Sequence, residues 1–353
     1  MKFRVESDTL RSATTKASAA IGRPGNLAAL HGLHVHAGGD LVTIRGTDLD
    51  LTITDRIDAD IDRPGAAVIP ARPFASFLAK NPGAVTVDCD DTTATLTVDD
   101  TTARLRLIPV HDYPQMPADT GQPIAAEGLG AAAVRVAPFA RSDQALGGSI
   151  LGIRLDPGKV VATDSYRMAV ADVPDLDAAA TVPAAAVLAA ARHADDLTIA
   201  SDDRHVTLTA DRCSWRTGLI EEDYPQWQRL LRADSPHHLT VNREALLEAL
   251  DRVAFLAPSQ DTTGGRNVVR FHIDETRLQI EAITKDVGDV TTVIDCTSDA
   301  PAGFRVAFNA GFLGQALAAH TIDDVTLDLV DALKPTVITE PGFLTLLMPV
   351  RVP

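Results

Sequence analysis

The part of the sequence that decides the fold is Val160-Val161-Ala162-Thr163-Asp164-Ser165-Tyr166-Arg167-Met168-Ala169-Val170. Two apolar runs flank a short polar segment, which is the pattern of two strands joined by a tight connection. Related segments stand at 43–53 and, more faintly, at 280–287. The aligned residues Thr47, Thr163 and Thr284 lie 116 and then 121 positions apart, and one third of the 353-residue chain is about 118. The spacing predicts one structural unit repeated three times.

Two further markers repeat in phase with this segment. A strand-to-helix transition is expected at Val68-Ile69-Pro70-Ala71, at Thr181-Val182-Pro183-Ala184 and at Ala307-Phe308-Asn309-Ala310, because Pro and Asn suit the start of a helix. Each repeat then closes at a proline, in Asp112-Tyr113-Pro114, Asp223-Tyr224-Pro225 and Met348-Pro349-Val350. The second and third markers are 44, 42 and 40 residues apart, so order and spacing both support three repeats.

The repeats predict three domains, at 1–120, 127–236 and 238–353. Residues 116–130, rich in Pro, Gly and Ala, and the polar residues 232–238 are expected to be linkers. Each repeat has about eight strand-like segments, mostly antiparallel hairpins. Pairs of helices are expected at 7–21 and 71–80, at 137–146 and 183–194, and at 242–257 and 309–319. The predicted class is α+β, because two helices per repeat cannot cover both faces of a doubly wound sheet. The helices are expected to line one common face.

Composition restricts the setting of the protein. Apolar residues make up 45% of the chain, which is ordinary for a globular protein. No run approaches the roughly 18 apolar residues of a membrane span, and the N-terminus lacks the apolar core of a signal peptide. Cys89, Cys213 and Cys296 fall one per repeat without CxxC pairing, which disfavours a disulfide framework and a zinc site. A reducing cytoplasm is the expected location, with no membrane partner and no cofactor.

Segments spread over the whole chain resemble the bacterial sliding clamps, the β subunits of DNA polymerase III. The matching segments are Met1-Lys2-Phe3, Gly46-Thr47-Asp48-Leu49, Val68-Ile69-Pro70-Ala71-Arg72, Ala162-Thr163-Asp164-Ser165-Tyr166-Arg167-Met168-Ala169, Asp223-Tyr224-Pro225, Asn309-Ala310 and Met348-Pro349-Val350-Arg351. The resemblance implies a head-to-tail homodimeric ring around double-stranded DNA, with helices inside and sheets outside. It implies a processivity factor without catalytic residues, opened by a clamp-loading ATPase. It leaves open whether this is a housekeeping copy or a divergent actinobacterial or phage-borne one.

The resemblance also implies a peptide-binding cleft between the second and third domains. Its partners would be the DNA polymerase III α subunit, other polymerases and repair proteins, each through a short peptide motif. Met and Leu would form an adaptable apolar floor, and Arg167 and Arg229 would hold peptide carbonyls or a carboxylate. Carried over residue by residue, the wall of the cleft is Ile150, Thr163, Tyr166, Arg167, Met168, Pro225, Arg229, Leu230, Leu346, Met348, Pro349 and Val350.

The net charge of −16 conflicts with a DNA partner, because phosphate binding usually leaves a basic footprint. A ring that holds DNA by topology resolves the conflict if its basic residues lie on the lining helices. Gly147-Gly148-Ser149 and Ala184-Ala185-Ala186 stand where the family often has aromatic or basic residues, which predicts weaker direct contact with DNA. The residues expected to face DNA are Arg23, Arg72, Gln144, Arg141, Arg192 and Arg252.

Other chemistry is weakly supported by the sequence. His31, His34 and His36 are not accompanied by Cys or carboxylates at metal-ligand spacing, so exposed strand histidines are favoured over a metal site. Asp90-Asp91 and Asp99-Asp100 fall at expected hairpin turns, and neither G-x-S-x-G nor a P-loop motif occurs. The alternative function is a repeat-built hydrolase with acidic residues at a domain junction. The alternative role for Arg167 and Met168 is a place in the core.

Overall fold

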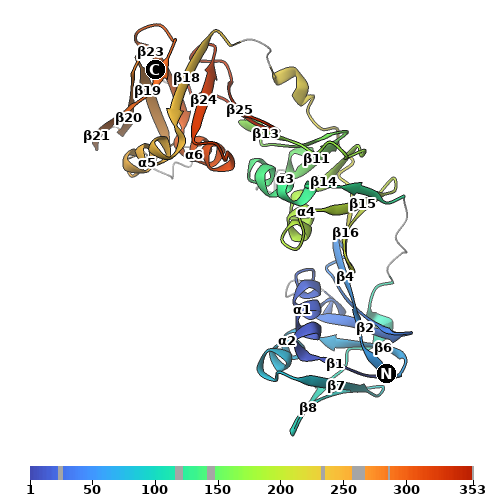
Figure 1. Ribbon diagram of the computed structural model, residues 1–353. Helices are drawn as coiled ribbons and strands as arrows, with labels where there is room; N and C mark the ends of the chain where they lie inside the picture. Colours follow the sequence, from blue (N-terminus) through green and yellow to red (C-terminus); the bar gives the residue numbers. More distant parts are fainter. Residues whose placement is uncertain are drawn as a thin grey trace. The chain divides into compact units, whose positions relative to one another are not determined.

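The computed structural model describes residues 1–22, 27–115, 122–140, 148–231, 235–256, 267–284 and 287–351. The helices and strands of the chain are drawn in Figure 1, and the chain divides into two compact units. Unit 1 comprises Met1–Gly130 and Ala185–Leu219, and unit 2 comprises Ala131–Ala184 and Ile220–Pro353. The middle repeat therefore contributes one part of its chain to each unit.

The described strands of unit 1 form two antiparallel sheets. Sheet A has the order β5-β1-β7-β8-β9, and sheet B has the order β10-β15-β16-β17-β4-β3-β2-β6. The strands are β1 (Lys2–Glu6), β2 (Gly32–Gly38), β3 (Leu41–Thr47), β4 (Leu51–Asp58), β5 (Asp60–Arg63), β6 (Gly65–Pro70), β7 (Ala84–Cys89), β8 (Thr93–Val98), β9 (Thr101–Arg106), β10 (Ile124–Ala126), β15 (Leu197–Ser201), β16 (His205–Ala210) and β17 (Cys213–Gly218).

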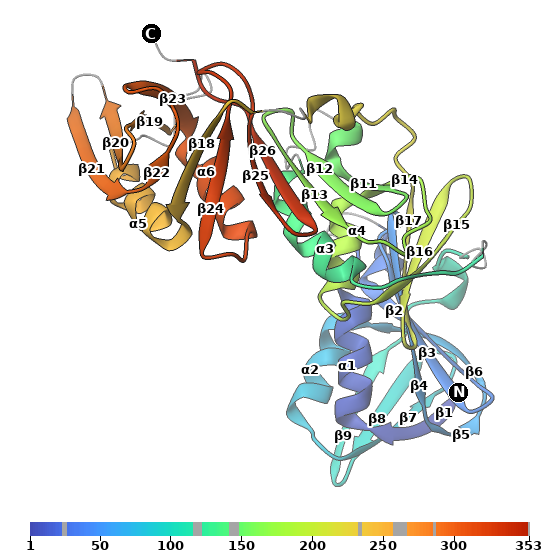
Figure 2. The same cartoon turned by 45° about the horizontal axis from the view of Figure 1, so that its top comes forward.

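Two helices of the first repeat, α1 (Ser7–Ser18) and α2 (Ala71–Lys80), lie side by side and complete the core of unit 1 (Figure 2). Leu10 of α1 and Phe74 of α2 are fully buried with Phe3 of β1, and each such side chain contributes about 1.5–3 kcal/mol to folding. Gly46 in β3 is required by this packing, because a Cβ there would stand 2.1 Å from the carbonyl oxygen of Ala17. The other helical segments are α4 (Ala184–Ala191), which starts at the boundary of the units, η1 (Ala28–His31) and η2 (Val110–Asp112).

The described strands of unit 2 form two further antiparallel sheets. Sheet C has the order β14-β11-β12-β13-β26-β25-β24-β18-β22, and sheet D has the order β21-β20-β19-β23. The strands are β11 (Gly152–Asp156), β12 (Lys159–Thr163), β13 (Arg167–Asp172), β14 (Ala180–Pro183), β18 (His237–Asn242), β19 (Val268–Ile273), β20 (Arg277–Thr284), β21 (Gly288–Asp295), β22 (Thr297–Ser298), β23 (Phe304–Asn309), β24 (Asp324–Leu329), β25 (Thr336–Glu340) and β26 (Phe343–Leu347).

Asparagines start the two helices of the third repeat, as the sequence predicts. The side-chain oxygen of Asn242 accepts a 3.0 Å hydrogen bond from the Ala245 amide, and that of Asn309 accepts one of 3.1 Å from the Phe312 amide. Each cap satisfies a backbone donor that the first turn leaves without a partner. The helices are α5 (Arg243–Ala254) and α6 (Ala310–Ala319), which pack beside one another in unit 2.

The helix expected at 137–146 is wrong in its position. The helix of this region is α3 (Leu129–Val136), and residues 137–139 form the short 3-10 turn η3 (Ala137–Phe139). The first two residues of α3, Leu129 and Gly130, fall in the predicted linker, and Ala131 to Ala133 continue the helix because alanine is the strongest helix former. Pro138 then prevents the α-helix from continuing. Residues 141–146 lie outside the described part of the chain.

The two large sheets repeat one arrangement. In sheet B the strand β4 pairs with β17, and in sheet C the strand β13 pairs with β26. Reading outward from these pairs, β3-β2-β6 corresponds to β12-β11-β14, and β16-β15-β10 corresponds to β25-β24-β18. The segments 43–53 and 160–170 therefore occupy the same place in two sheets.

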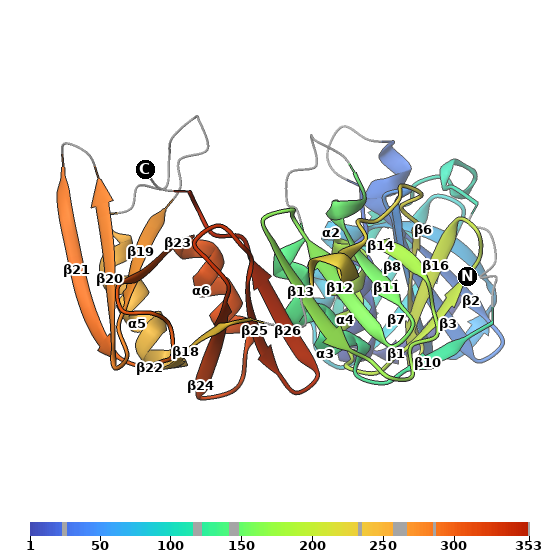
Figure 3. The same ribbon diagram turned by 90° about the horizontal axis from the view of Figure 1, so that it is seen from above.

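Each described sheet ends in two edge strands, among them β9 in unit 1 and β21 in unit 2. β9 ends sheet A and exposes Arg104 and Arg106. β21, seen beside β20 in Figure 3, ends sheet D and exposes Asp289 and Asp295. An edge strand presents unpaired backbone groups that a further strand can bind. Here the two edges also carry side chains of opposite charge.

Candidate functional site

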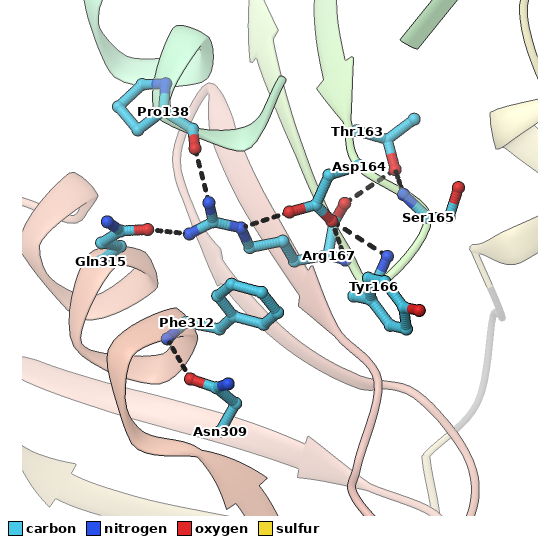
Figure 4. A network of polar contacts seen from close by, with 9 residues as sticks. All are labelled: Pro138, Thr163, Asp164, Ser165, Tyr166, Arg167, Asn309, Phe312 and Gln315. Carbon is cyan, nitrogen blue, oxygen red and sulfur yellow. Dashed lines mark hydrogen bonds and ion pairs between the residues drawn. The ribbon is translucent and has the colours of Figure 1, made fainter. Parts of the chain in front are cut away.

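The connection between β12 and β13 is held by its own polar side chains (Figure 4). The Thr163 hydroxyl donates to the Arg167 carbonyl at 2.7 Å and accepts from the Ser165 amide at 3.2 Å. One carboxylate oxygen of Asp164 accepts from the amides of Tyr166, at 2.9 Å, and Arg167, at 3.0 Å. These bonds hold Ser165 in the left-handed region, at φ 77°, and turn the Tyr166 side chain out to solvent.

Arg167 is buried, and its guanidinium donates hydrogen bonds to three groups of unit 2. Its Nε donates to Asp164 at 2.9 Å, its Nη2 donates to the Pro138 carbonyl at 2.7 Å, and its Nη1 donates to the Gln315 side chain (Figure 4). The guanidinium also lies 4.4 Å from the centre of the Phe312 ring, a favourable cation–π distance. Arg167 thereby joins β13 to η3 and α6. This use differs from the peptide contact that the resemblance implies for its guanidinium.

A second arginine, Arg135, contacts the C-terminal end of α6. Arg135 of α3 donates from Nε to the Ala319 carbonyl at 3.0 Å, forms an ion pair with Glu340, and lies 3.7 Å from the centre of the Phe343 ring. The Glu340 carboxylate is almost fully buried and also accepts from the Thr321 amide at 2.9 Å. The second and third repeats are thus joined by two arginine contacts to one helix.

The residues expected to form the apolar floor of the cleft are buried next to this connection. Met168 and Leu346 are opposite each other on β13 and β26 and are buried in one cluster with Trp227. Trp227 opens the short turn η6 (Trp227–Leu230) and donates from Nε1 to Asp156 at 2.9 Å. Together these residues form a covered apolar layer on sheet C.

Three other predicted cleft residues, called the rim below, are exposed at the surface of unit 2. Tyr166 is 58% exposed, Leu230 44% and Met348 40%. The Met348 amide donates to the Tyr166 carbonyl at 2.8 Å, which ties the chain after β26 to the β12–β13 connection. Of the other predicted cleft residues, Pro225 and Arg229 are exposed, Ile150, Pro349 and Val350 are half-buried, and Thr163 is buried. All twelve predicted cleft residues belong to unit 2.

Several residues of this site were not predicted from the sequence. Phe312 and Gln315 reach it from α6, and Pro138 reaches it from η3. The capping motif at Asn309 located the start of α6, but nothing in the sequence indicated which face of that helix meets Arg167. Trp227 was absent from the predicted set, although its nearness to Tyr224-Pro225 was a usable signal.

The residues predicted to face DNA are only partly described. Arg72 on α2, Arg192 just after α4 and Arg252 on α5 are exposed. Arg252 forms a 2.8 Å ion pair with Glu248. Arg23, Arg141 and Gln144 lie outside the described residues. The helices α4 and α6 contain no charged residue in their sequences.

The described residues support neither a metal site nor a pair of catalytic acids. These hold no group of three His, Cys, Asp or Glu side chains that is suited to a metal ion. The His34 ring instead lies 5.3 Å from the Tyr113 ring, at an angle of 31°, and Asp90 accepts 2.7 Å hydrogen bonds from the amides of Thr92 and Thr93 in its own turn. Among the described helices, none has both the length and the apolar character needed to cross a bilayer.

The fold defines the class of the protein. A DNA polymerase sliding clamp from Bacillus subtilis superposes with a TM-score of 0.91 over 100% of both chains, at 20% identity. A sliding clamp (DNA polymerase III subunit beta) from Pseudomonas aeruginosa, solved bound to griselimycin, gives a TM-score of 0.91 over 100% of both chains, at 19% identity. The fold is therefore that of the DNA sliding clamps.

Sequence comparison gives the family. Residues 1–117 match the model of the N-terminal domain of the DNA polymerase III beta subunit, and residues 228–351 match that of its C-terminal domain. The beta sliding clamp of Synechococcus elongatus is 26% identical over 334 residues, covering 88% of this chain and 87% of that protein. That of Streptomyces coelicolor is 25% identical over 383 residues, covering 99% of each. The chain belongs to the DNA polymerase III beta subunit family, the beta sliding clamps, which are non-catalytic; the hydrolase alternative has no support.

Proposed function

We propose that this sliding clamp encircles double-stranded DNA as a head-to-tail homodimer and tethers the DNA polymerase III α subunit, other polymerases and repair proteins. The tether is the cleft of unit 2. The observation that carries this assignment is the exposed rim of Tyr166, Leu230 and Met348 above the buried floor of Met168 and Leu346. An apolar patch of this kind, bordered by polar residues such as Arg229, is typical of a protein-binding site.

A peptide would insert apolar side chains between the rim residues. Met348 and Leu230 can adjust to different side chains, which suits a site with several partners. Arg167 and its network would act as the rigid support, because ordering the cleft in advance lowers the entropic cost of binding. Arg229, which is exposed, would meet a carboxylate or a carbonyl of the peptide.

The experiment changes Met348 to Asp and measures binding of a fluorescent peptide that carries the apolar anchor of the host's DNA polymerase III α subunit. The control is Leu49→Asp, since Leu49 is also an exposed apolar residue but belongs to unit 1. Losing an anchor contact of about 2 kcal/mol or more weakens binding at least about 30-fold. Equal affinity of the folded Met348→Asp variant and the wild type would refute the cleft.

The proposed dimer joins the edge strand β9 of one chain to the edge strand β21 of the other. The domains at 1–120, 127–236 and 238–353 would give six similar domains in a ring of two chains. β9 of one chain and β21 of the other can pair, with Arg104 and Arg106 attracted to Asp289 and Asp295. Analytical ultracentrifugation should give twice the chain mass of 37.4 kDa at micromolar concentration. A monomer alone under those conditions contradicts the ring.

Retention on DNA is proposed to be topological. Strong phosphate contacts release counterions and make binding salt-sensitive, so a chain of net charge −16 is expected to bind linear DNA weakly. Once a clamp-loading ATPase has placed the ring on circular DNA, it should survive moderate salt and leave when the circle is cut. Loss at equal rates from circular and linear DNA would exclude topological retention.

A further inference from the structure

A hollow lies on sheet C next to Leu230, one of the predicted cleft residues. It has a volume of about 510 Å³ and is lined from η6, β18, β24, β25 and β26. Leu344 of β26 lines it and faces away from α6, because the neighbouring Thr345 contacts His320 at the end of α6 and successive strand residues alternate between faces. All of its lining residues belong to unit 2 and to the described part of the chain.

The hollow continues the apolar layer of the cleft. Val337 and Leu344, which line the hollow, pack against the cluster that contains the cleft floor residues Met168 and Leu346. Leu230 is common to both features, as an exposed rim residue of the cleft and as a wall of the hollow. A chain bound in the cleft can therefore pass over Leu230 into the hollow without leaving apolar surface.

The opposite end of the hollow is acidic. A hydrogen bond of 2.9 Å joins Nδ1 of His238 to the Asp299 carboxylate, and Nε2 of His238 lies 3.8 Å from the Asp328 carboxylate. Two carboxylates face one imidazole, so the group stays negative whether or not His238 is protonated. Burial raises the pKa of Asp328 because it removes water from the carboxylate. A cation placed nearby would offset this unfavourable desolvation. Lys334 is exposed and is not part of the lining.

We propose that this hollow is an extension subsite of the cleft, which takes an apolar side chain and then a lysine or arginine from the same partner peptide. The inference rests on the proposed function of the cleft. The volume falls within the roughly 300–1,000 Å³ typical of ligand pockets, which is enough for one apolar side chain and the stem of a basic one. Partners that carry the extension would bind in preference to those that end at the cleft.

The test compares three synthetic peptides by fluorescence anisotropy at one salt concentration. The first carries only the apolar anchor of the host's DNA polymerase III α subunit, and the others extend it by Leu-Lys or by Leu-Glu, at whichever end approaches Leu230. The Leu-Lys peptide should bind about tenfold more tightly than the anchor alone, and the Leu-Glu peptide should gain less.

Two variants distinguish the contribution of charge from that of apolar contact to the affinity for the extended peptides. Asp328→Asn should remove the preference for Lys over Glu, whereas the control Asp323→Asn, an exposed carboxylate of the same unit, should retain it. Thr339→Trp fills the hollow from an exposed lining position, so folding is preserved and the gain from either extension should disappear. Binding of the anchor peptide should be unchanged in both variants.

The possible outcomes discriminate the two proposals. Equal affinity of all three peptides for the wild type overturns the subsite and leaves the cleft intact. A gain that persists in Thr339→Trp, or a Lys preference that persists in Asp328→Asn, also overturns it. An anchor peptide that fails to bind the wild type overturns the cleft and, with it, the extension.

Discussion

The turn after β3 in unit 1 and the turn after β12 in unit 2 have the same hydrogen bonds. Asp48 accepts from the amides of Asp50, at 3.1 Å, and Leu51, at 2.8 Å, as Asp164 accepts from those of Tyr166 and Arg167. Leu49 is at φ 85° and corresponds to Ser165 at φ 77°. A Thr-Asp pair followed by a left-handed residue is sufficient to form the turn in both units.

The side chains beside the two turns differ completely. In unit 2 the paired residues Met168 and Leu346 are apolar and form the cleft floor, whereas the corresponding pair in unit 1 is Thr52 and Arg216. Both Thr52 and Arg216 are buried polar residues with partners of their own. The repeated backbone is therefore not what makes a binding site, since only one of these two copies has the apolar floor.

The largest expected difference between the two turns comes from their aspartates. Asp164→Ala removes the carboxylate that accepts from two backbone amides and leaves the buried Arg167 without its ion partner, so unit 2 should lose about 3–5 kcal/mol of unfolding free energy. Asp48→Ala also removes the acceptor of two backbone amides but breaks no such ion pair, and unit 1 should lose about 1 kcal/mol. Hydrogen exchange read by mass spectrometry reports each unit separately. Equal losses of unfolding free energy in Asp164→Ala and Asp48→Ala would show that the contact with Arg167 does not stabilise the turn.

A smaller difference is expected between the helix-to-strand ion pairs. Arg135→Ala leaves the buried Glu340 uncompensated and removes the bond to Ala319, so unit 2 should lose about 3 kcal/mol. Lys16→Ala in unit 1 also leaves a buried carboxylate, that of Asp55 at 3.0 Å, but among the described residues Lys16 makes no second side-chain contact, so the cost should be lower, about 2 kcal/mol. Urea unfolding followed by the same exchange method measures both. A larger loss for Lys16→Ala would reverse the comparison.

The smallest expected effects are opposite in sign for one histidine of each unit. Burial, with the charge of Arg45, lowers the pKa of His34 to about 4, so only the unfolded chain takes up this proton between pH 6.5 and 4. His34 therefore makes unit 1 less stable as the pH falls through that range. The hydrogen bond to Asp299 raises the pKa of His238, so its contribution to unit 2 is complete below pH 6.5 and is lost as the pH rises through the raised pKa.

Thermal unfolding from pH 4 to pH 8 tests both signs against matched variants. His34→Gln should flatten the loss of unit 1 below pH 6.5, and His238→Gln should flatten the loss of unit 2 above it. Slopes that equal those of the wild type in both variants would contradict these assignments.

The α+β class, most elements and the likeness of the segments 43–53 and 160–170 were predictable because they depend on local pattern. Period-two strands and the caps at Asn242 and Asn309 act within a few residues of sequence. The start of α3 was missed because Gly and Ala are common to linkers and helices, and packing decides between them. The network of Arg167 was beyond prediction from spacing alone, since Pro138 and Gln315 reach it from elements 29 and 148 residues away.

The unlike edges β9 and β21 have a consequence for how the proposed ring would open. After one junction forms, the second closes within a single complex, at an effective concentration on the order of millimolar for short tethers. A ring with one junction broken is therefore still held by the other, and it recloses without recruiting a new subunit. Opening would then be a reversible gate with a fast return, and full separation into two chains would be a much rarer event.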